Sequence, residues 1–249
     1  MPATVFLVTL EGNIGAGKST LLRAVEALDH ADVVVVQEPV DLWCAPSLPD
    51  GQSMLKAYYS APAKTAMAFQ MYTMLTRVQQ IAKSMIHARA KAAASGRNVV
   101  VLTERCSWSD YEIFGRPMRD LGILSDAEWF TYTAWFKAVT DVGGGPTVGE
   151  SDRGIRPTGL VYLRCSAEKC IDRITERARS GEQDIDVAYV RRLHVAHETY
   201  VASARAPGSG YKSVLEIDGA AEGTDAVQIA AERVVGFVLS QSSTAVSRS

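Results

Sequence analysis

The chain has 249 residues, 47% of them hydrophobic and 22% charged, which is typical of a globular protein that can bury a sizeable core. Its 26 basic and 28 acidic side chains give a formal net charge of −2, so the charge balance does not support a nucleic-acid or membrane partner. The four cysteines include no C-x-x-C pair, which favours free thiols in a reducing compartment.

The first predicted element is an apolar strand over residues 4–10, followed by GNIGAGKS and a helical pattern over residues 19–28. The segment 12–19 matches the P-loop pattern G-x-x-x-x-G-K-[ST] at every position, in the strand–loop–helix context that a phosphate site requires. In such a loop, backbone N–H groups line an anion site, Lys18 reaches the β- and γ-phosphates and Ser19 ligates Mg²⁺. The alternative is a glycine-rich turn with an incidental lysine. The residues expected to bind ATP phosphates are Gly12, Asn13, Ile14, Gly15, Ala16, Gly17, Lys18, Ser19 and Thr20.

The position of this first strand in the sequence indicates the cellular compartment of the protein. It begins at about Thr4, which leaves no room for a signal or transit peptide before it. Elsewhere the sequence contains no apolar run of membrane-spanning length. We therefore expect a cytoplasmic protein, with the nucleus as the alternative.

Strands and helices alternate along the rest of the chain, which predicts a parallel sheet covered by helices on both faces. Further strands are expected at 32–37, 98–103, 158–164 and 213–217. Helices are expected at 63–94, 109–121, 125–142, 167–179, 185–206 and 222–239. The remaining stretches are interpreted as irregular (42–62), a mobile surface loop (143–157) and a disordered tail (241–249). We expect one α/β domain of the P-loop NTPase type over residues 1–240.

Polar residues follow several strands at the carboxyl edge of the expected sheet, where ligands bind in open α/β folds. Glu38 could take a proton from an attacking hydroxyl, Glu104 could hold Mg²⁺ and Arg105 could hold the acceptor. Arg173 and Arg177 lie on one helix face, a repulsive arrangement unless an anion such as a triphosphate joins them. Each group also has an ordinary structural interpretation. Glu38 could be a solvated glutamate, Glu104 and Arg105 a surface ion pair, and the arginines part of a solvent-facing helix.

Five blocks of the sequence together resemble the deoxynucleoside kinase family. In chain order they are EGNIGAGKST, QEPVDLW, AFQMYTMLTR, TERCSWSDYEIF and CIDRITERARSGEQDI. This family includes the deoxycytidine, deoxyguanosine and mitochondrial thymidine kinases and the insect multisubstrate enzyme. The resemblance, which runs from about residue 4 to 239, implies a parallel five-stranded sheet and a homodimer formed through long helices. It also implies an enzyme of nucleotide salvage that transfers the γ-phosphate of ATP, with Mg²⁺, to the 5′-hydroxyl of a deoxynucleoside.

The resemblance implies catalytic roles for residues around the P-loop. Glu38 resembles the base at the 5′-hydroxyl and Arg105 its partner, while Glu104 resembles the acidic neighbour of Mg²⁺ and is the rival for the role of base. A lid over the phosphates is implied at about 173–184, with the arginines Arg173, Arg177 and Arg179. The turn 219–223 falls where the family holds adenine.

Other matched positions resemble the family's nucleoside pocket. Gln70 resembles the amide that pairs with the base edge, and Tyr59 and Glu182 resemble the residues that hold the sugar 3′-hydroxyl. The walls of the pocket are implied at Trp43, Leu55, Phe69 and Phe114. Without the resemblance, these walls would be ordinary core residues, Gln70 an exposed helix residue and Tyr59 a surface aromatic.

Two positions bear on the preferred base. Arg77 lies two helical turns after Gln70, and Asp110 follows the Glu-Arg pair. In the family such a pair accompanies deoxycytidine and purine deoxynucleosides, whereas thymidine-preferring members have smaller or apolar residues. An Arg77–Asp110 pair would fill the space that a thymine methyl needs, so we expect deoxycytidine, deoxyadenosine or deoxyguanosine to be preferred over thymidine.

The sequence also departs from the family pattern. Cys106 stands where serine is usual, Asp184 stands where the lid often has glycine, and the loop 143–157 is longer than usual. Two alternative functions follow from the same motifs: a nucleoside monophosphate kinase of the thymidylate type, or a non-catalytic relative that serves as a structural subunit. A monophosphate kinase needs basic residues to bind the phosphate of its acceptor, and this chain has the acidic Glu38 where they would begin. The presence of Lys18, Ser19, Glu38 and Arg105 argues against a non-catalytic relative.

Overall fold

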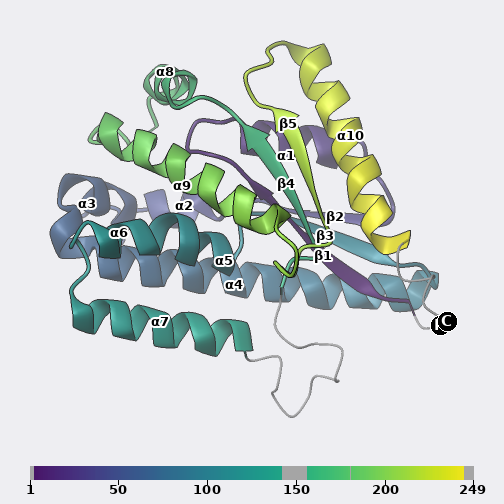
Figure 1. Cartoon of the computed structure of the whole chain (residues 1–249), viewed down its shortest axis with the longest axis horizontal. Helices are drawn as coiled ribbons and strands as arrows, with labels where there is room; N and C mark the ends of the chain where they lie inside the picture. Colours follow the sequence, from purple (N-terminus) through teal and green to yellow (C-terminus); the bar gives the residue numbers. More distant parts are fainter. Residues whose placement is uncertain (1–2, 142–155, 180, 244–249) are drawn as a thin grey trace.

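Five parallel strands form the central sheet, in the order β2-β3-β1-β4-β5. The computed structural model describes residues 3–141, 156–179 and 181–243. The strands are β1 (Val5–Glu11), β2 (Val33–Val36), β3 (Val99–Glu104), β4 (Gly159–Arg164) and β5 (Ser213–Asp218). Because the strands are parallel, the carboxyl ends of β1, β2 and β3 lie together at one edge of the sheet (Figure 1).

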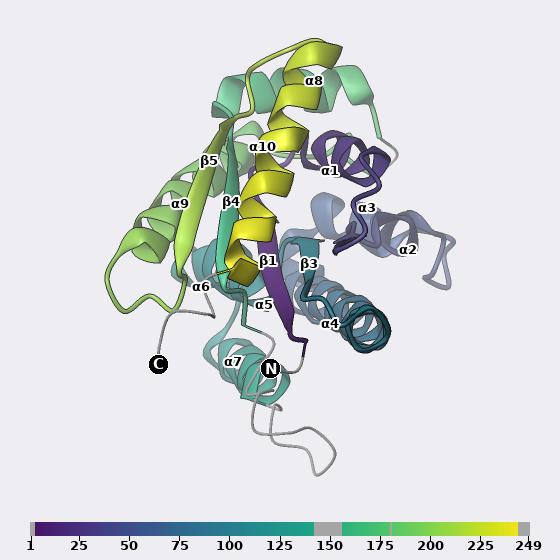
Figure 2. The same cartoon turned by 90° about the vertical axis from the view of Figure 1, so that its right-hand side faces the viewer.

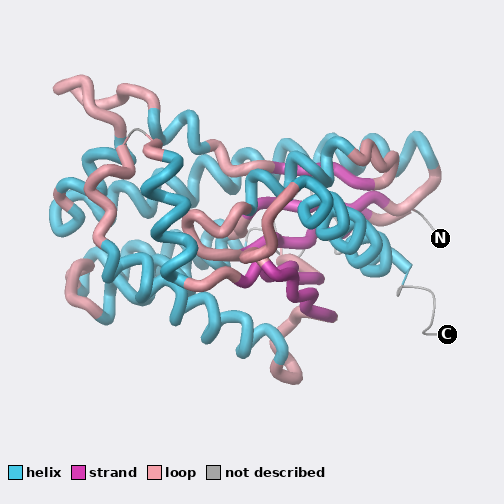
Figure 3. Tube along the Cα trace, turned by 90° about the horizontal axis from the view of Figure 1, so that it is seen from above, coloured by secondary structure: helices cyan, strands magenta, loops and turns pink. Residues whose placement is uncertain are grey.

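Helices cover both faces of this sheet, and Figure 3 shows the strands enclosed between them. Those up to β3 are α1 (Lys18–Ala27), α2 (Val40–Cys44), α3 (Met54–Ser60) and α4 (Pro62–Ser95). Between β3 and β4 lie α5 (Ser107–Ser109), the π-helix η1 (Asp110–Gly115), α6 (Arg116–Asp120) and α7 (Asp126–Asp141). The last are α8 (Ala167–Arg177), α9 (Val187–Arg205) and α10 (Thr224–Ser243). No helix in the described ranges combines the length and the apolar character needed to cross a bilayer.

The core divides by sheet face, as the period of a β-strand requires. Alternate residues of β1, including Val8 and Leu10, pack with α1 and α10 on one face (Figure 2). Leu7 of the same strand points to the other face, where Val99 and Val101 of β3 pack against α4. A separate aromatic cluster beyond the carboxyl edge joins α2, α3, α4 and α6, so it fixes the elements that surround the end of β2.

All five strands and the α/β class predicted from the sequence are confirmed, with strand boundaries shifted by one residue at most ends. The strands of a parallel sheet are buried on both faces, so their continuous apolar runs identify them clearly. The long predicted helix is also present as α4, with Pro62 at its first turn and Gly96, at φ +67°, closing its end.

Several local predictions are wrong. The stretch 42–62 contains most of α2 and all of α3 rather than irregular chain. Pro46 and Pro49 lie between these helices, and Ser53 caps α3 by accepting a hydrogen bond from the Lys56 N–H. The helical stretch predicted over 109–121 is present as an unbroken run over 107–120, but it contains the unpredicted π-helix η1 between α5 and α6. Helix α10 runs to Ser243, three residues into the predicted tail, and residues 244–249 and 143–155 lie outside the described ranges.

The π-helix η1 is fixed by a close approach between Gly115 and α7. A Cβ added to Gly115 would lie 2.3 Å from an atom of the Tyr132 ring, which is fully buried. Since η1 begins at Asp110, this contact helps to place a residue that the sequence assigns to the site.

We expect Gly115→Ala to lower the free energy of unfolding by about 1–3 kcal/mol, because the methyl group displaces the Tyr132 ring in a packed core. Gly236→Ala is the matched control: Gly236 lies in α10 with nothing within 4 Å of the added Cβ, so the change should stabilise the protein by about 0.5–1 kcal/mol. Urea denaturation measures both. Equal effects of the two variants would contradict the packing argument.

Candidate active site

The P-loop is shaped by glycines in backbone conformations that other residues rarely adopt. Gly15 and Gly17 have φ of +81° and +98°, and a Cβ on Gly15 would lie 2.4 Å from the Cys170 carbonyl oxygen. Lys18 Nζ donates to the Asn13 carbonyl at 3.0 Å, and Asn13 Nδ2 donates to the Val190 carbonyl of α9 at 2.9 Å. The loop is therefore closed on itself, with the N-terminus of α1 directed at the space that a phosphate would occupy.

Glu104, at the end of β3, faces the P-loop. Its carboxylate accepts a hydrogen bond from Ser19 Oγ at 3.2 Å and lies 3.6 Å from Lys18 Nζ. Burial, followed by the nearby Glu38 charge, raises the pKa of Glu104 above its ordinary value. A serine hydroxyl beside a carboxylate provides the oxygen ligands that Mg²⁺ prefers, and such sites complete their shell with water and phosphate oxygens.

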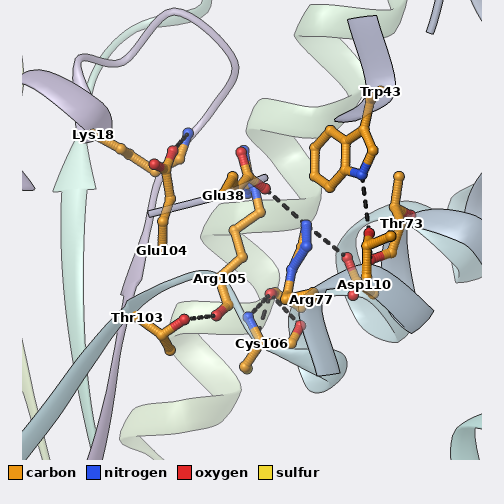
Figure 4. A network of polar contacts seen from close by, with 12 residues as sticks. Lys18, Glu38, Trp43, Thr73, Arg77, Thr103, Glu104, Arg105, Cys106 and Asp110 are labelled. Carbon is orange, nitrogen blue, oxygen red and sulfur yellow. Dashed lines mark hydrogen bonds and ion pairs between the residues drawn. The ribbon is translucent and has the colours of Figure 1, made fainter. Parts of the chain in front are cut away.

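Glu38, just beyond the end of β2, lies between two buried guanidinium groups (Figure 4). Its Oε1 lies 2.7 Å from Arg77 Nη2 and 3.1 Å from Arg105 Nε. Burial alone would raise the pKa of Glu38, but the Arg77 and Arg105 charges outweigh it and hold the pKa below its ordinary value. The carboxylate is therefore ionised at neutral pH and ready to accept a proton.

Arg105 is held in an unusual backbone conformation. Its φ is +62°, in the left-handed region that residues other than glycine rarely adopt. Thr103 Oγ1 donates to the Arg105 carbonyl at 3.1 Å, and the Arg105 guanidinium lies 4.7 Å from the centre of the Phe114 ring. Strain of this kind persists where the surroundings over-determine it, and here it directs the side chain toward Glu38.

Helix α4 contributes a row of polar side chains opposite the P-loop. Arg77 Nη2 lies 3.3 Å from Asp110 Oδ1, and both residues are almost fully buried. Gln70 Oε1, Arg77 Nε and Nη1, and Asp110 Oδ2 have no hydrogen-bond partner in the described part of the chain. Buried polar atoms are normally paired, so this set of free donors and acceptors indicates a polar ligand.

One cavity of about 180 Å³ joins these groups. All the nucleoside-pocket residues predicted from the sequence line it, together with the P-loop face, Glu104 and two lid arginines. They are Glu38, Trp43, Leu55, Tyr59, Phe69, Gln70, Arg77, Arg105, Asp110, Phe114 and Glu182, with Lys18, Ser19, Thr20, Glu104, Arg177 and Arg179. Trp43 and Phe69 meet edge to face, and Trp43 Nε1 donates to Thr76 Oγ1 at 3.0 Å, which fixes this wall.

The three predicted lid arginines separate into two positions. Arg173 Nη1 donates to the carbonyls of Gly219 at 2.7 Å and Ala16 at 3.3 Å, so it joins the P-loop to the turn 219–223 beside a second cavity of about 310 Å³. Arg177 and Arg179 instead face the main cavity, where both contact the Glu182 carboxylate, at 2.6 and 3.1 Å. Arg173 therefore does not share an anion with Arg177 here, although both lie on α8 as the spacing predicts.

Sequence reasoning missed five residues that line the cavity: Arg23, Val40, Tyr58, Thr73 and Tyr189. Thr73 lies three residues after Gln70 on the same face of α4, so the helical period could have identified it. Tyr189 comes from α9, far along the chain, and no local pattern marks it.

Two of the three departures from the family pattern lie within the described ranges, and the third, the loop 143–157, lies mostly outside them. Cys106 is the N-cap of α5, where its side chain accepts a hydrogen bond from the Ser109 N–H, and Ser109 Oγ accepts one from the Cys106 N–H at 2.9 Å. Asp184 accepts a hydrogen bond from Ser60 Oγ at 2.7 Å, which ties the end of the predicted lid to α3.

Comparison with known proteins gives a consistent result. The family model described as deoxynucleoside kinase matches residues 8–238. Deoxycytidine kinase 2 of Gallus gallus is 31% identical over 207 residues, covering 78% of this chain and 73% of the relative. Deoxycytidine kinase of Mus musculus is 30% identical over 206 residues, covering 78% and 74%. The mitochondrial deoxyguanosine kinase of Xenopus laevis is 26% identical over 204 residues, covering 78% and 72%.

The buried Asp110 makes stability depend on pH. Burial raises its pKa to about 6, against an ordinary value of 3.8. The folded state therefore holds this proton more tightly than the unfolded chain does, so the stability that Asp110 contributes is complete below about pH 4 and is lost as the pH rises through 6. We expect Asp110→Asn to flatten the fall in unfolding free energy over this window by roughly 1–3 kcal/mol, measured by urea denaturation at several pH values. A variant with the wild-type slope would contradict this assignment.

Proposed function

Because this chain belongs to the deoxynucleoside kinase family, we propose that its main cavity binds a deoxynucleoside opposite the phosphates of ATP. The enzyme transfers the γ-phosphate of ATP to the 5′-hydroxyl of the deoxynucleoside, in nucleotide salvage. The observation that carries this proposal is the position of the ionised Glu38 in one cavity with Lys18 and Ser19 of the P-loop. A carboxylate at the place where the phosphate acceptor binds can accept the proton of a nucleoside hydroxyl. The same negative charge repels an acceptor that already carries a phosphate.

Glu38 acts as the base and Arg105 as its partner. As the 5′-oxygen forms a bond to the γ-phosphorus, the bond from that phosphorus to the bridging oxygen breaks, ADP leaves and the hydroxyl proton passes to Glu38. The Arg77 and Arg105 contacts at 2.7 and 3.1 Å hold the carboxylate in place for this transfer. Lys18, Arg177 and Arg179 stabilise the negative charge that moves across the phosphates.

Glu104 has a different role from Glu38. Its pKa is raised by burial, and it faces Ser19 and Lys18 rather than the nucleoside end of the cavity. Ser19 and Glu104 would hold Mg²⁺, which when bound neutralises charge on the β- and γ-phosphates. This division leaves Glu38 as the base and makes Glu104 the ligand of the metal or of its waters.

The unpartnered polar atoms of Gln70, Arg77 and Asp110 support recognition of the nucleobase. An amide, a guanidinium and a carboxylate together offer donors and acceptors to the exocyclic and ring nitrogen atoms of cytosine, adenine or guanine. Tyr59 and Glu182 would hold the sugar 3′-hydroxyl, since both line the same cavity. The adenine of ATP would lie in the second cavity, beside Arg173 and the turn 219–223.

The remaining expectations concern assembly and location. Ile86 of α4 and Phe130 of α7 are 65% and 76% exposed, which supports a homodimer formed through these two helices. The cytoplasmic location and the lack of a nucleic-acid partner stay predictions from the sequence.

Glu38→Gln removes the base but keeps the size of the side chain. We expect turnover to fall by about 10²–10⁴-fold, with ATP affinity changed much less, because the close ion pairs of Glu38 in the described part of the chain are with Arg77 and Arg105. Steady-state kinetics and calorimetric ATP binding measure the two effects. Glu112→Gln is the control, since Glu112 pairs with Arg116 on the exposed side of η1. Retained turnover in Glu38→Gln together with its loss in Glu104→Gln would make Glu104 the base.

The Arg77–Asp110 pair should set the base preference. We expect kcat/KM for deoxycytidine, deoxyadenosine or deoxyguanosine to exceed that for thymidine by about tenfold or more, because a base without matching groups leaves buried polar atoms unpaired. Replacing both residues, as Arg77→Met with Asp110→Ala, should narrow this ratio. A wild-type enzyme for which thymidine is the best substrate would contradict the assignment.

A further inference from the structure

Behind the main cavity, a second layer of side chains contacts Arg105 on the side away from Glu38. Arg105 Nη1 lies 3.2 Å from His197 Nε2 and 3.6 Å from Glu11 Oε2. Glu11 is the last residue of β1 and His197 comes from α9; neither lines the cavity, and both are fully buried. The proposed catalytic mechanism assigns them no role.

The hydrogen bonds of His197 determine which of its ring nitrogens is protonated. Nδ1 lies 2.6 Å from the Leu193 carbonyl oxygen, which can only accept, so Nδ1 carries the hydrogen. Nε2 is then an acceptor for the Arg105 Nη1–H. Burial and the Arg105 charge hold the pKa of His197 well below its ordinary value, so the ring stays neutral. His197 therefore orients Arg105 without adding a charge.

Glu11 supplies the charge that His197 does not. Its Oε1 accepts a hydrogen bond from Thr9 Oγ1 at 2.7 Å, while Oε2 has no hydrogen-bond partner within the described ranges and faces Arg105. Burial raises the pKa of Glu11 to about 7. The ionisable groups that face it from neighbouring elements are Arg105, Arg77, Lys18, Cys106, Tyr200 and Tyr211.

We propose that Glu11 and His197 are positioning residues that hold the Arg105 guanidinium from behind, so that its Nε points at Glu38. This inference rests on the proposed function, because Arg105 and Glu38 are assigned there to the acceptor hydroxyl. Ionised Glu11 places a second carboxylate beside Arg105, and protonated Glu11 leaves only His197 on that side. The support from Glu11 is therefore present above about pH 7 and absent below it.

The proposal is tested by the ratio of wild-type to Glu11→Gln kcat across pH. We expect this ratio to be near one at about pH 6, where Glu11 is itself neutral, and to rise to about tenfold at about pH 8. Groups that titrate equally in both proteins, such as Asp110, cancel in the ratio. The KM for ATP should not change, whereas damage to the adjoining P-loop would raise it at every pH. Glu216→Gln, at a partly exposed position of the edge strand β5, is the matched control.

His197 is tested by a pair of variants. His197→Leu removes the acceptor and should lower kcat by about tenfold at all pH values, while His197→Gln supplies a side-chain oxygen and should restore part of the loss. His87→Leu, at an exposed position of α4, is the control. Equal losses in both His197 variants would show a packing role and overturn the positioning role.

A measurement that needs no turnover separates this inference from the proposed function. The ¹⁵N resonance of Arg105 Nε, identified by its loss in Arg105→Lys, should shift with an apparent pKa of about 7 in the wild type and not in Glu11→Gln. A wild-type enzyme that phosphorylates no deoxynucleoside but shows this shift would contradict the proposed function and leave the contact between Glu11 and Arg105 established. A resonance that does not move, or a kcat ratio that is constant with pH, would overturn the inference.

Discussion

The carboxylate of Glu38, held between the guanidinium groups of Arg77 and Arg105, is the interaction on which the site depends. Removing an acid from water favours its neutral form, and nearby cations, led by Arg77 and Arg105, keep this carboxylate charged. A buried network of this kind adds little to stability, because desolvation offsets much of the attraction between its members. Its value lies in fixing the direction of one oxygen atom next to a phosphate-binding loop.

The fold brings these groups together with short chain segments. The parallel strands β1, β2 and β3 end at one edge, so the residues that follow them meet although they are about 30 and 70 positions apart in the chain. Helix α4 crosses this edge and adds Gln70 and Arg77 from a single face. The aromatic cluster of α2, α3 and α6 then closes the far side, which makes a pocket from what would otherwise be an open crevice.

The parts of this arrangement that follow from short-range pattern could be predicted from the sequence. Buried parallel strands are continuous apolar runs, the P-loop is a contiguous motif, and Gln70 and Arg77 share a helical period. The short helices α2 and α3 and the π-helix η1 were not predicted: α2 has no side-chain cap, α3 is capped by Ser53 within a stretch that contains several prolines, and η1 packs Gly115 against Tyr132 of another helix. The second layer was equally hidden, since Glu11 and His197 meet only in the folded chain and neither carries a motif of its own.

The lid contact has a consequence for how the two substrates affect one another. The Glu182 carboxylate neutralises Arg177 and Arg179 in the structure, yet in the proposed roles it serves the sugar while they serve the triphosphate. A nucleoside that engages Glu182 releases both cations, and a nucleotide that engages the cations releases the acid. By thermodynamic linkage, each substrate then tightens the binding of the other by the same factor. With either order of binding, the ternary complex is therefore favoured over the two binary complexes.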